Sequence, residues 1–71
     1  MDAIEYRGYK IEAKIDSLAF DPLECTFYEI SEISNNDLDG ALLVQSEENF
    51  DIAERAIDAA KDYVDKRLIA A

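Results

Sequence analysis

Apolar and polar residues alternate through Tyr9–Asp16, and this is the clearest pattern in the chain. The odd positions hold Tyr, Ile, Ala and Ile, and the even positions hold charged residues. Such alternation predicts a strand with one buried side and one solvent-facing side. Ile4 and Tyr6 also alternate with polar residues, but on even numbers, and the parity changes at Arg7–Gly8. A glycine at a change of parity predicts either a β-bulge or a tight turn.

Two further strands are predicted downstream. The segment Leu23–Ile33 is rich in Thr, Phe, Tyr and Ile, and Ala41–Gln45 is a short, mainly apolar run. Between them, Ser34–Gly40 contains the Asn, Asp and Gly residues that tolerate the left-handed backbone of a turn. Ser17–Pro22 breaks the alternation and predicts a loop, in which Phe20 is either folded onto the core or exposed.

A long amphipathic helix is predicted for Phe50–Ile69. Its apolar side chains recur at helical spacing and are expected to face the sheet: Ala53, Ala56, Ile57, Ala60, Tyr63 and Val64. Asp51, followed three residues later by Glu54, has the spacing of a capping box at the helix start. We therefore predict a single domain, residues 1–71, of the α+β class: a three-stranded antiparallel meander with one C-terminal helix packed on one face.

The second predicted strand has apolar residues on both parities. Leu23, Cys25 and Phe27 share one parity, whereas Tyr28 and Ile30 have the other. Because one helix covers only one face of a sheet, two explanations are open. Either an interface, such as one with a second copy of the chain, covers the second face with Tyr28 and Ile30 as anchors, or the strand bulges and all these groups share one core.

Five carboxylates recur at three- and four-residue steps along the predicted helix. They are Asp51, Glu54, Asp58, Asp62 and Asp65. At about 100° per residue they fall within a sector roughly 80° wide, opposite the apolar side. Glu54 with Asp58, and Asp58 with Asp62, are like-charge pairs at i,i+4, which cost helix stability. Glu47 and Glu48 extend this negative surface, and these seven acids form the candidate partner-binding surface.

The net charge of −10, from 17 acids and 7 bases, narrows the kinds of partner. Direct binding to nucleic acid is disfavoured because it depends on Lys and Arg neutralising phosphates. A basic protein surface is the expected partner, and an ordinary solvated acidic face is the alternative.

The residue types present also limit the chemistry. The chain has no His, a single Cys (Cys25), no apolar run of membrane-spanning length and no basic-then-apolar leader. We therefore predict no enzymatic activity, no cofactor, no membrane partner and a cytoplasmic location, with Cys25 as a buried small hydrophobe.

One acidic segment has the spacing of a metal site. Asn35, Asp37, Asp39 and Gly40 match the first half of an EF-hand calcium loop. The twelfth position of such a loop holds a bidentate Glu, but here it is Ser46, and the flanking segments have strand patterns. We predict an acidic turn without a metal.

Two resemblances follow from these features. Tyr6-Arg7-Gly8-Tyr9, the meander and the closing Ala56–Leu68 helix resemble small bacterial and phage proteins with a βββα fold, related in shape to HicB-type antitoxins and double-stranded-RNA-binding domains. The basic residues that RNA-binding folds use are not present. Small size, strong acidity and an acid-striped helix resemble phage inhibitors that imitate DNA, the anti-restriction and anti-CRISPR proteins.

The second resemblance implies a function. The helix carboxylates would stand in for phosphates and occlude a nucleic-acid-binding surface of a bacterial defence complex. The alternative is an antitoxin-like or housekeeping module that binds protein through its sheet face or an edge strand, for which a homodimer is expected.

Overall fold

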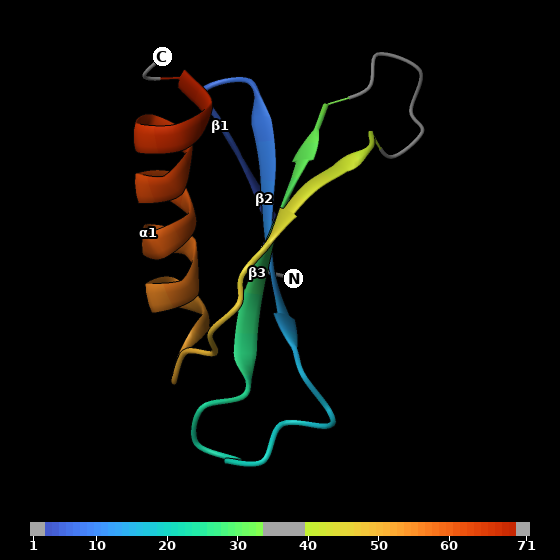
Figure 1. The fold of residues 1–71 in the computed structure, drawn as a ribbon, viewed down its shortest axis with the longest axis vertical. Helices are drawn as coiled ribbons and strands as arrows, with labels where there is room; N and C mark the ends of the chain where they lie inside the picture. Colours follow the sequence, from blue (N-terminus) through green and yellow to red (C-terminus); the bar gives the residue numbers. More distant parts are fainter. Residues whose placement is uncertain (1–2, 34–39, 70–71) are drawn as a thin grey trace.

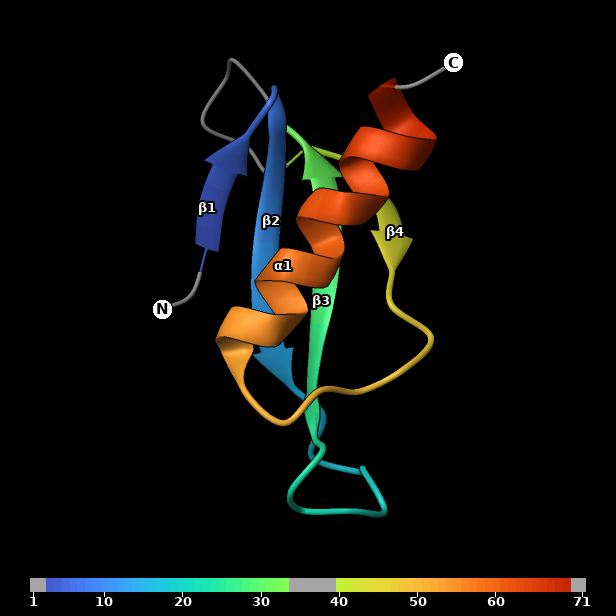
Figure 2. The ribbon, with the colours of Figure 1, turned by 90° about the vertical axis from the view of Figure 1, so that its left-hand side faces the viewer.

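The computed structural model describes residues 3–33 and 40–69, which form a four-stranded antiparallel sheet with a helix against one face (Figure 1). The elements are β1 (Ala3–Tyr6), β2 (Tyr9–Ile15), β3 (Thr26–Glu32), β4 (Leu42–Gln45), α1 (Ala53–Tyr63) and the π-helical η1 (Val64–Ile69). The strands are neighbours in chain order, and α1 and η1 run across them (Figure 2). The α+β class, the antiparallel sheet and the C-terminal helix are confirmed.

The predicted number of strands is wrong, because the parity change at residues 7 and 8 is a tight turn. Arg7 and Gly8 both have positive φ, 50° and 90°. A two-residue turn with two positive φ angles matches the twist of a hairpin. It pairs Tyr6 with Tyr9, so both side chains lie on the same face although one number is even and the other odd. The segment upstream of the turn is therefore a strand of its own, β1.

The core lies between the sheet and the helix. Cross-strand pairing brings Ile11 opposite Ile30 and Ala13 opposite Tyr28 on the face that α1 covers. The buried apolar residues come from two strands and the helix: Ile11, Tyr28, Ile30, Ala56, Ala60 and Val64. Small Ala side chains on the helix let its backbone approach the sheet closely, so the branched residues of β2 and β3 fill the space between the two layers.

The structure corrects the assignment of Tyr28 and Ile30 as anchors of a sheet-face interface. Tyr28 is 8% exposed and Ile30 is fully buried, both in the core. The register between β3 and β4 shifts at Ile30–Ser31, and Val44 of β4 pairs with Ile30 and packs against the same core. The register shift supports a bulge. Leu23, Cys25 and Phe27 nevertheless lie outside this core, so the prediction that all these groups share one core is wrong.

The opposite face of the sheet carries charged side chains and also the apolar side chains of Phe27 and Leu42, which pair with Lys14 and Ser31. Glu12 and Glu29 are cross-strand neighbours, and Lys14 Nζ lies 2.8 Å from the Glu29 carboxylate. Phe27, next to Lys14 across the strands, is partly buried. This face therefore carries charged cross-strand contacts with water on the outside, as antiparallel sheets with one covered face do.

Two predicted element boundaries also differ. β3 begins at Thr26 rather than Leu23, because the Glu24 N–H donates to the Asp21 carbonyl and closes a turn before the strand. The predicted capping box is wrong: α1 begins after Ile52, which makes no side-chain cap. Asp51 instead accepts a hydrogen bond from the Ile52 N–H.

Some sequence-based predictions concern residues outside this description. Apart from Gly40, the proposed calcium ligands at 35–39 lie outside the described residues.

Cys25 is partly exposed rather than buried, and its thiol donates to the Pro22 carbonyl. Within 3–33 and 40–69, no helix has the length and apolar character needed to cross a membrane.

Candidate protein-binding surface

The five predicted acids are not equivalent, since Asp51 precedes α1 and Asp65 contacts the β1–β2 hairpin. Asp51, Glu54, Asp58 and Asp62 are exposed, whereas Asp65 is partly buried. Arg55 Nε lies 3.5 Å from the Asp51 carboxylate, and Lys66 Nζ lies 3.2 Å from Asp62. Such exposed i,i+4 pairs contribute little stability but offset the negative charge locally.

Glu54 and Asp58 are the two helix acids that keep their charge uncompensated. Both are exposed, and no Lys or Arg among the described residues forms an ion pair with either. They lie one helical turn apart beside β1, where a shallow hollow of about 420 Å³ also includes Ile4 and Lys61. The two uncompensated carboxylates give this part of the helix a localised negative surface, at a small cost in helix stability.

Asp65 has a structural role instead. Its carboxylate accepts hydrogen bonds from the Tyr6 hydroxyl at 2.9 Å and from Arg7 Nη1 at 2.7 Å. The Lys61 ammonium lies 5.6 Å from the centre of the Tyr6 ring. These contacts join the β1–β2 hairpin to the end of the helix. They also explain why Arg7 occupies a left-handed backbone conformation that is costly for a residue other than Gly, since the turn directs its guanidinium to Asp65.

The Asp65 cluster changes the pKa values of its members. The hydrogen bonds from Arg7 and then from Tyr6 lower the pKa of the Asp65 carboxyl. The hydrogen bond to Asp65, together with burial, raises the pKa of the Tyr6 hydroxyl. A carboxyl with a lowered pKa stabilises the folded state when it is ionised, and this contribution is lost as the pH falls through the folded-state pKa.

An Asp65→Asn variant is therefore expected to have a lower melting temperature than the unchanged protein at pH 7. The difference between the two should persist down to about pH 4, the ordinary pKa of an Asp carboxyl, and shrink as the pH falls further through the lowered folded-state pKa of Asp65. Thermal unfolding followed by circular dichroism measures this. Asp58→Asn is the matched control, since it removes an exposed carboxylate without a described partner. Equal pH dependence of the two variants would contradict the structural role of Asp65.

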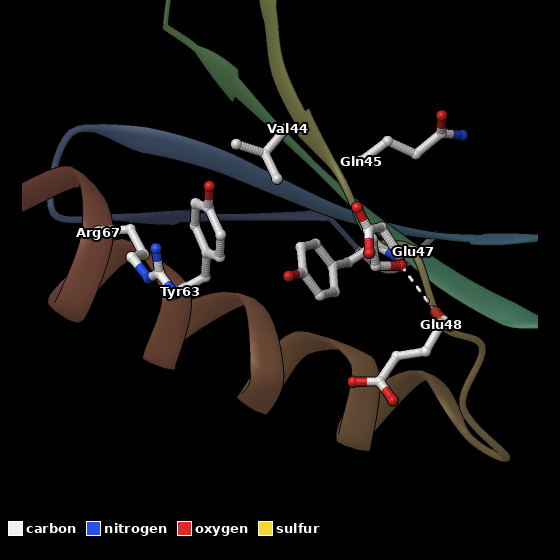
Figure 3. A pocket seen from close by; sticks show the side chains of 8 residues that line it. Val44, Gln45, Glu47, Glu48, Tyr63 and Arg67 are labelled. Carbon is white, nitrogen blue, oxygen red and sulfur yellow. Dashed lines mark hydrogen bonds between the residues drawn. The ribbon is translucent and has the colours of Figure 1, made fainter.

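Glu47 and Glu48 lie on a different flank, on the connection from β4 to α1. They line a hollow of about 600 Å³ between β4 and the end of the helix. Figure 3 shows Tyr63 and Arg67 reaching into it from the helix and Val44 from β4. The Ser46 hydroxyl donates to the Glu48 carbonyl at 3.0 Å and so shapes the start of the connection.

This flank gathers acids around the side chain of Tyr28. Burial raises the pKa of the Tyr28 hydroxyl, and the nearby Tyr63, Glu48 and Asp62 raise it further. Glu48 and Asp62 also line a second hollow of about 310 Å³, together with Tyr28, Tyr63 and basic side chains at the helix end. The structure thus brings Glu48 and Asp62 together on the β4 side, and separates them from Glu54 and Asp58 on the β1 side.

Charge is also divided along the length of the molecule. No Lys or Arg occurs between Lys14 and Arg55 in the sequence. This stretch supplies the β2–β3 and β4–α1 connections, which meet where Asn49 donates to Asp16 and Thr26 pairs with Phe50. Arg7 lies at the other end beside the last turn of the helix, where Lys66 and Arg67 also occur. The two connections at one end therefore contain no Lys or Arg, whereas Arg7, Lys66 and Arg67 lie at the other end.

The Asp65 cluster and the hollow beside β4 were not predicted from the sequence. Tyr6 and Asp65 are 59 residues apart, so no local spacing links them. Within 3–33 and 40–69, no group of three His, Cys, Asp or Glu side chains is arranged to hold a metal ion. No protein-family model matches the chain, and no curated protein or solved structure is significantly similar to it.

Proposed function

We propose that this protein is a non-enzymatic binding protein that occupies a basic, nucleic-acid-binding surface of a partner protein. In this proposal the helix carboxylates imitate phosphates, and the protein inhibits the partner, such as a bacterial defence complex, by steric and electrostatic occlusion. The observation that supports it best is the exposed Glu54 and Asp58 pair, which carries uncompensated like charge one helical turn apart. Such a surface steers a basic partner into fast, salt-sensitive association.

The structure narrows the surface used in this proposal. Asp65 is engaged by the hairpin, and Asp51 and Asp62 have basic neighbours on the helix. Glu54 and Asp58 would make the central contacts, with Asp51 and Asp62 at the rim and Glu47 and Glu48 on the adjoining flank. Binding that displaces Arg55 and Lys66 from their carboxylates costs little, because exposed ion pairs are weak.

The proposal is tested by capturing partners from a bacterial lysate with the immobilised protein at low and at high salt. A purified partner that is captured is then incubated with a DNA duplex and increasing amounts of this protein. We expect much stronger capture at low salt than at high salt, and loss of DNA binding as this protein is added. A partner retained equally at both salt concentrations, or one that binds this protein and DNA together, would contradict the proposal.

Neutralising the central pair is expected to weaken binding by about tenfold or more and to reduce its salt dependence. The variant is Glu54→Gln with Asp58→Asn, and affinity is measured by titration calorimetry at several salt concentrations. Glu5→Gln with Glu32→Gln is the matched control, because it removes the same number of exposed acids from the sheet. If both variants weaken binding equally, only the net charge of the protein matters. If neither variant weakens binding, the helix acids are solvated surface residues that do not contact the partner.

A further inference from the structure

The connection between β2 and β3 exposes large apolar side chains. Leu18 is 91% exposed, Phe20 is 103% exposed and Leu23 is 77% exposed, and Ile15 before them is also largely exposed. In Figures 1 and 2 this connection extends past the start of α1, so the helix does not cover it. None of these side chains contributes to the core. Exposed apolar groups that are close in sequence and not used for folding mark an interaction surface.

The backbone of this loop is already ordered by hydrogen bonds. Asp16 Oδ1 accepts from the Leu18 N–H at 3.0 Å, and Asp21 Oδ1 accepts from the Leu23 N–H at 2.9 Å. The Asp16 N–H donates to the Cys25 carbonyl at 2.6 Å and closes the base of the loop. Two aspartate-capped turns thus hold the apolar side chains outward. Such preorganisation lowers the entropy lost on binding.

The charges around the loop indicate the chemistry of the partner. Asp16, Asp21 and Glu24 are interspersed with the apolar residues, and the loop contains no Lys or Arg. A second copy of the chain would bring like charges together, and an anionic lipid surface would repel them. A protein with an apolar hollow rimmed by Lys and Arg is complementary to both the apolar and the acidic groups.

We propose that Leu18, Phe20 and Leu23 form an apolar knob that inserts into an apolar, base-rimmed hollow on a partner protein. The phenyl ring of Phe20 is the central anchor, because it is the largest and most exposed of the three. Asp16, Asp21 and Glu24 pair with the basic rim. This contact does not depend on the helix acids, and it adds a component that resists salt to a binding mode otherwise driven by charge.

The probe for this contact is a synthetic amphipathic helical peptide of Leu and Lys, whose apolar face is bordered by lysines. Its binding to the full chain is measured by fluorescence anisotropy. We expect Leu18→Ser, Phe20→Ser and Leu23→Ser together to weaken binding by about tenfold or more. The matched control replaces three other exposed apolar residues, Leu42, Leu43 and Ile52, with Ser, and should change binding by less than about twofold.

Further binding experiments distinguish this contact from binding to any apolar peptide, to lipid or to a second copy of the chain. A peptide of Leu and Glu with the same pattern should bind at least about tenfold more weakly than the Leu and Lys peptide. Neutral phosphatidylcholine vesicles and vesicles that also contain phosphatidylserine should not bind. Sedimentation should show no self-association that the loop variant reverses. Equal affinity for both peptides, retention on vesicles, or a dimer reversed by the loop variant would each overturn the proposal.

The same assay separates failure of this contact from failure of the proposed function. The variant Glu54→Gln with Asp58→Asn should retain the part of peptide binding that persists at high salt, and the loop variant should lose it. If only the helix variant loses this part of the binding, the proposed role of the apolar knob is wrong, and the proposed role of the acidic helix surface is retained. No saturable binding of the Leu and Lys peptide to the unchanged protein would also overturn the knob. Circular dichroism of each variant should match that of the unchanged protein, because the replaced side chains are exposed.

Discussion

An Ile30→Asp variant is expected to be unfolded at room temperature. Ile30 is fully buried at the centre of the sheet, between Ile11 of β2 and Val44 of β4 and beneath the helix. An unpaired carboxylate there costs several kcal/mol. The whole free energy of unfolding of a chain this size is about 4–10 kcal/mol. Circular dichroism should show loss of the native spectrum and of a cooperative thermal transition.

Ser31→Asp is the control for this effect. Ser31 is the next residue of β3 and pairs with Lys10, on the opposite face of the sheet. An acid there lies opposite Lys10 on the face that the helix does not cover, so the variant should keep the native spectrum and unfold within about 0.5 kcal/mol of the unchanged protein. A native spectrum for Ile30→Asp, or unfolding of Ser31→Asp, would mean that Ser31 rather than Ile30 lies on the face of β3 that the helix covers.

A Gly40→Ala variant is expected to lose about 2–3 kcal/mol of its free energy of unfolding. A Cβ atom at Gly40 would overlap the backbone carbonyl of Glu32. Since the Glu32 N–H donates to the Ala41 carbonyl, the chain cannot move away without weakening the pairing between β3 and β4. Urea unfolding measures the loss, and the change should appear in the midpoint rather than in the slope.

Gly8 provides the comparison, because it is constrained in a different way. It has φ of 90°, but a Cβ atom there would have no heavy atom within 4 Å. Gly8→Ala should therefore cost only the strain of a left-handed backbone, about 1 kcal/mol. A larger loss for Gly8→Ala than for Gly40→Ala would contradict the close approach of Gly40 to β3.

Local pattern predicted the elements well wherever neighbouring residues determine the conformation. The alternation around Ile11 predicted a strand, and the spacing of small apolar residues near Ala56 and Ala60 predicted the inner side of the helix. Local pattern failed at Arg7–Gly8, because a bulge and a two-residue turn both change the parity. It also failed at the helix start, where the chain begins the helix after Ile52 rather than at Asp51.

Some features of the candidate site could likewise be predicted from the sequence, and others could not. The exposure of Glu54, Asp58 and Asp62 follows from helical periodicity, whereas Asp51 precedes the first residue of α1. The ion pair between Asp65 and Arg7 could not be predicted in this way, because Arg7 reaches Asp65 only when the hairpin packs beside the last helical turn.

The sequence by itself determined the periodicity of the strands and the helix, the negative charge, and the side of the helix that carries it, since these depend on spacing within one element. Only the tertiary structure decided which acids stay uncompensated, that Tyr28 and Ile30 belong to the core, and that Phe20 is exposed. The physical reason is that burial and ion pairing depend on contacts between segments far apart in the chain. The helix begins short of the β2–β3 connection, and for this reason the apolar loop remains uncovered.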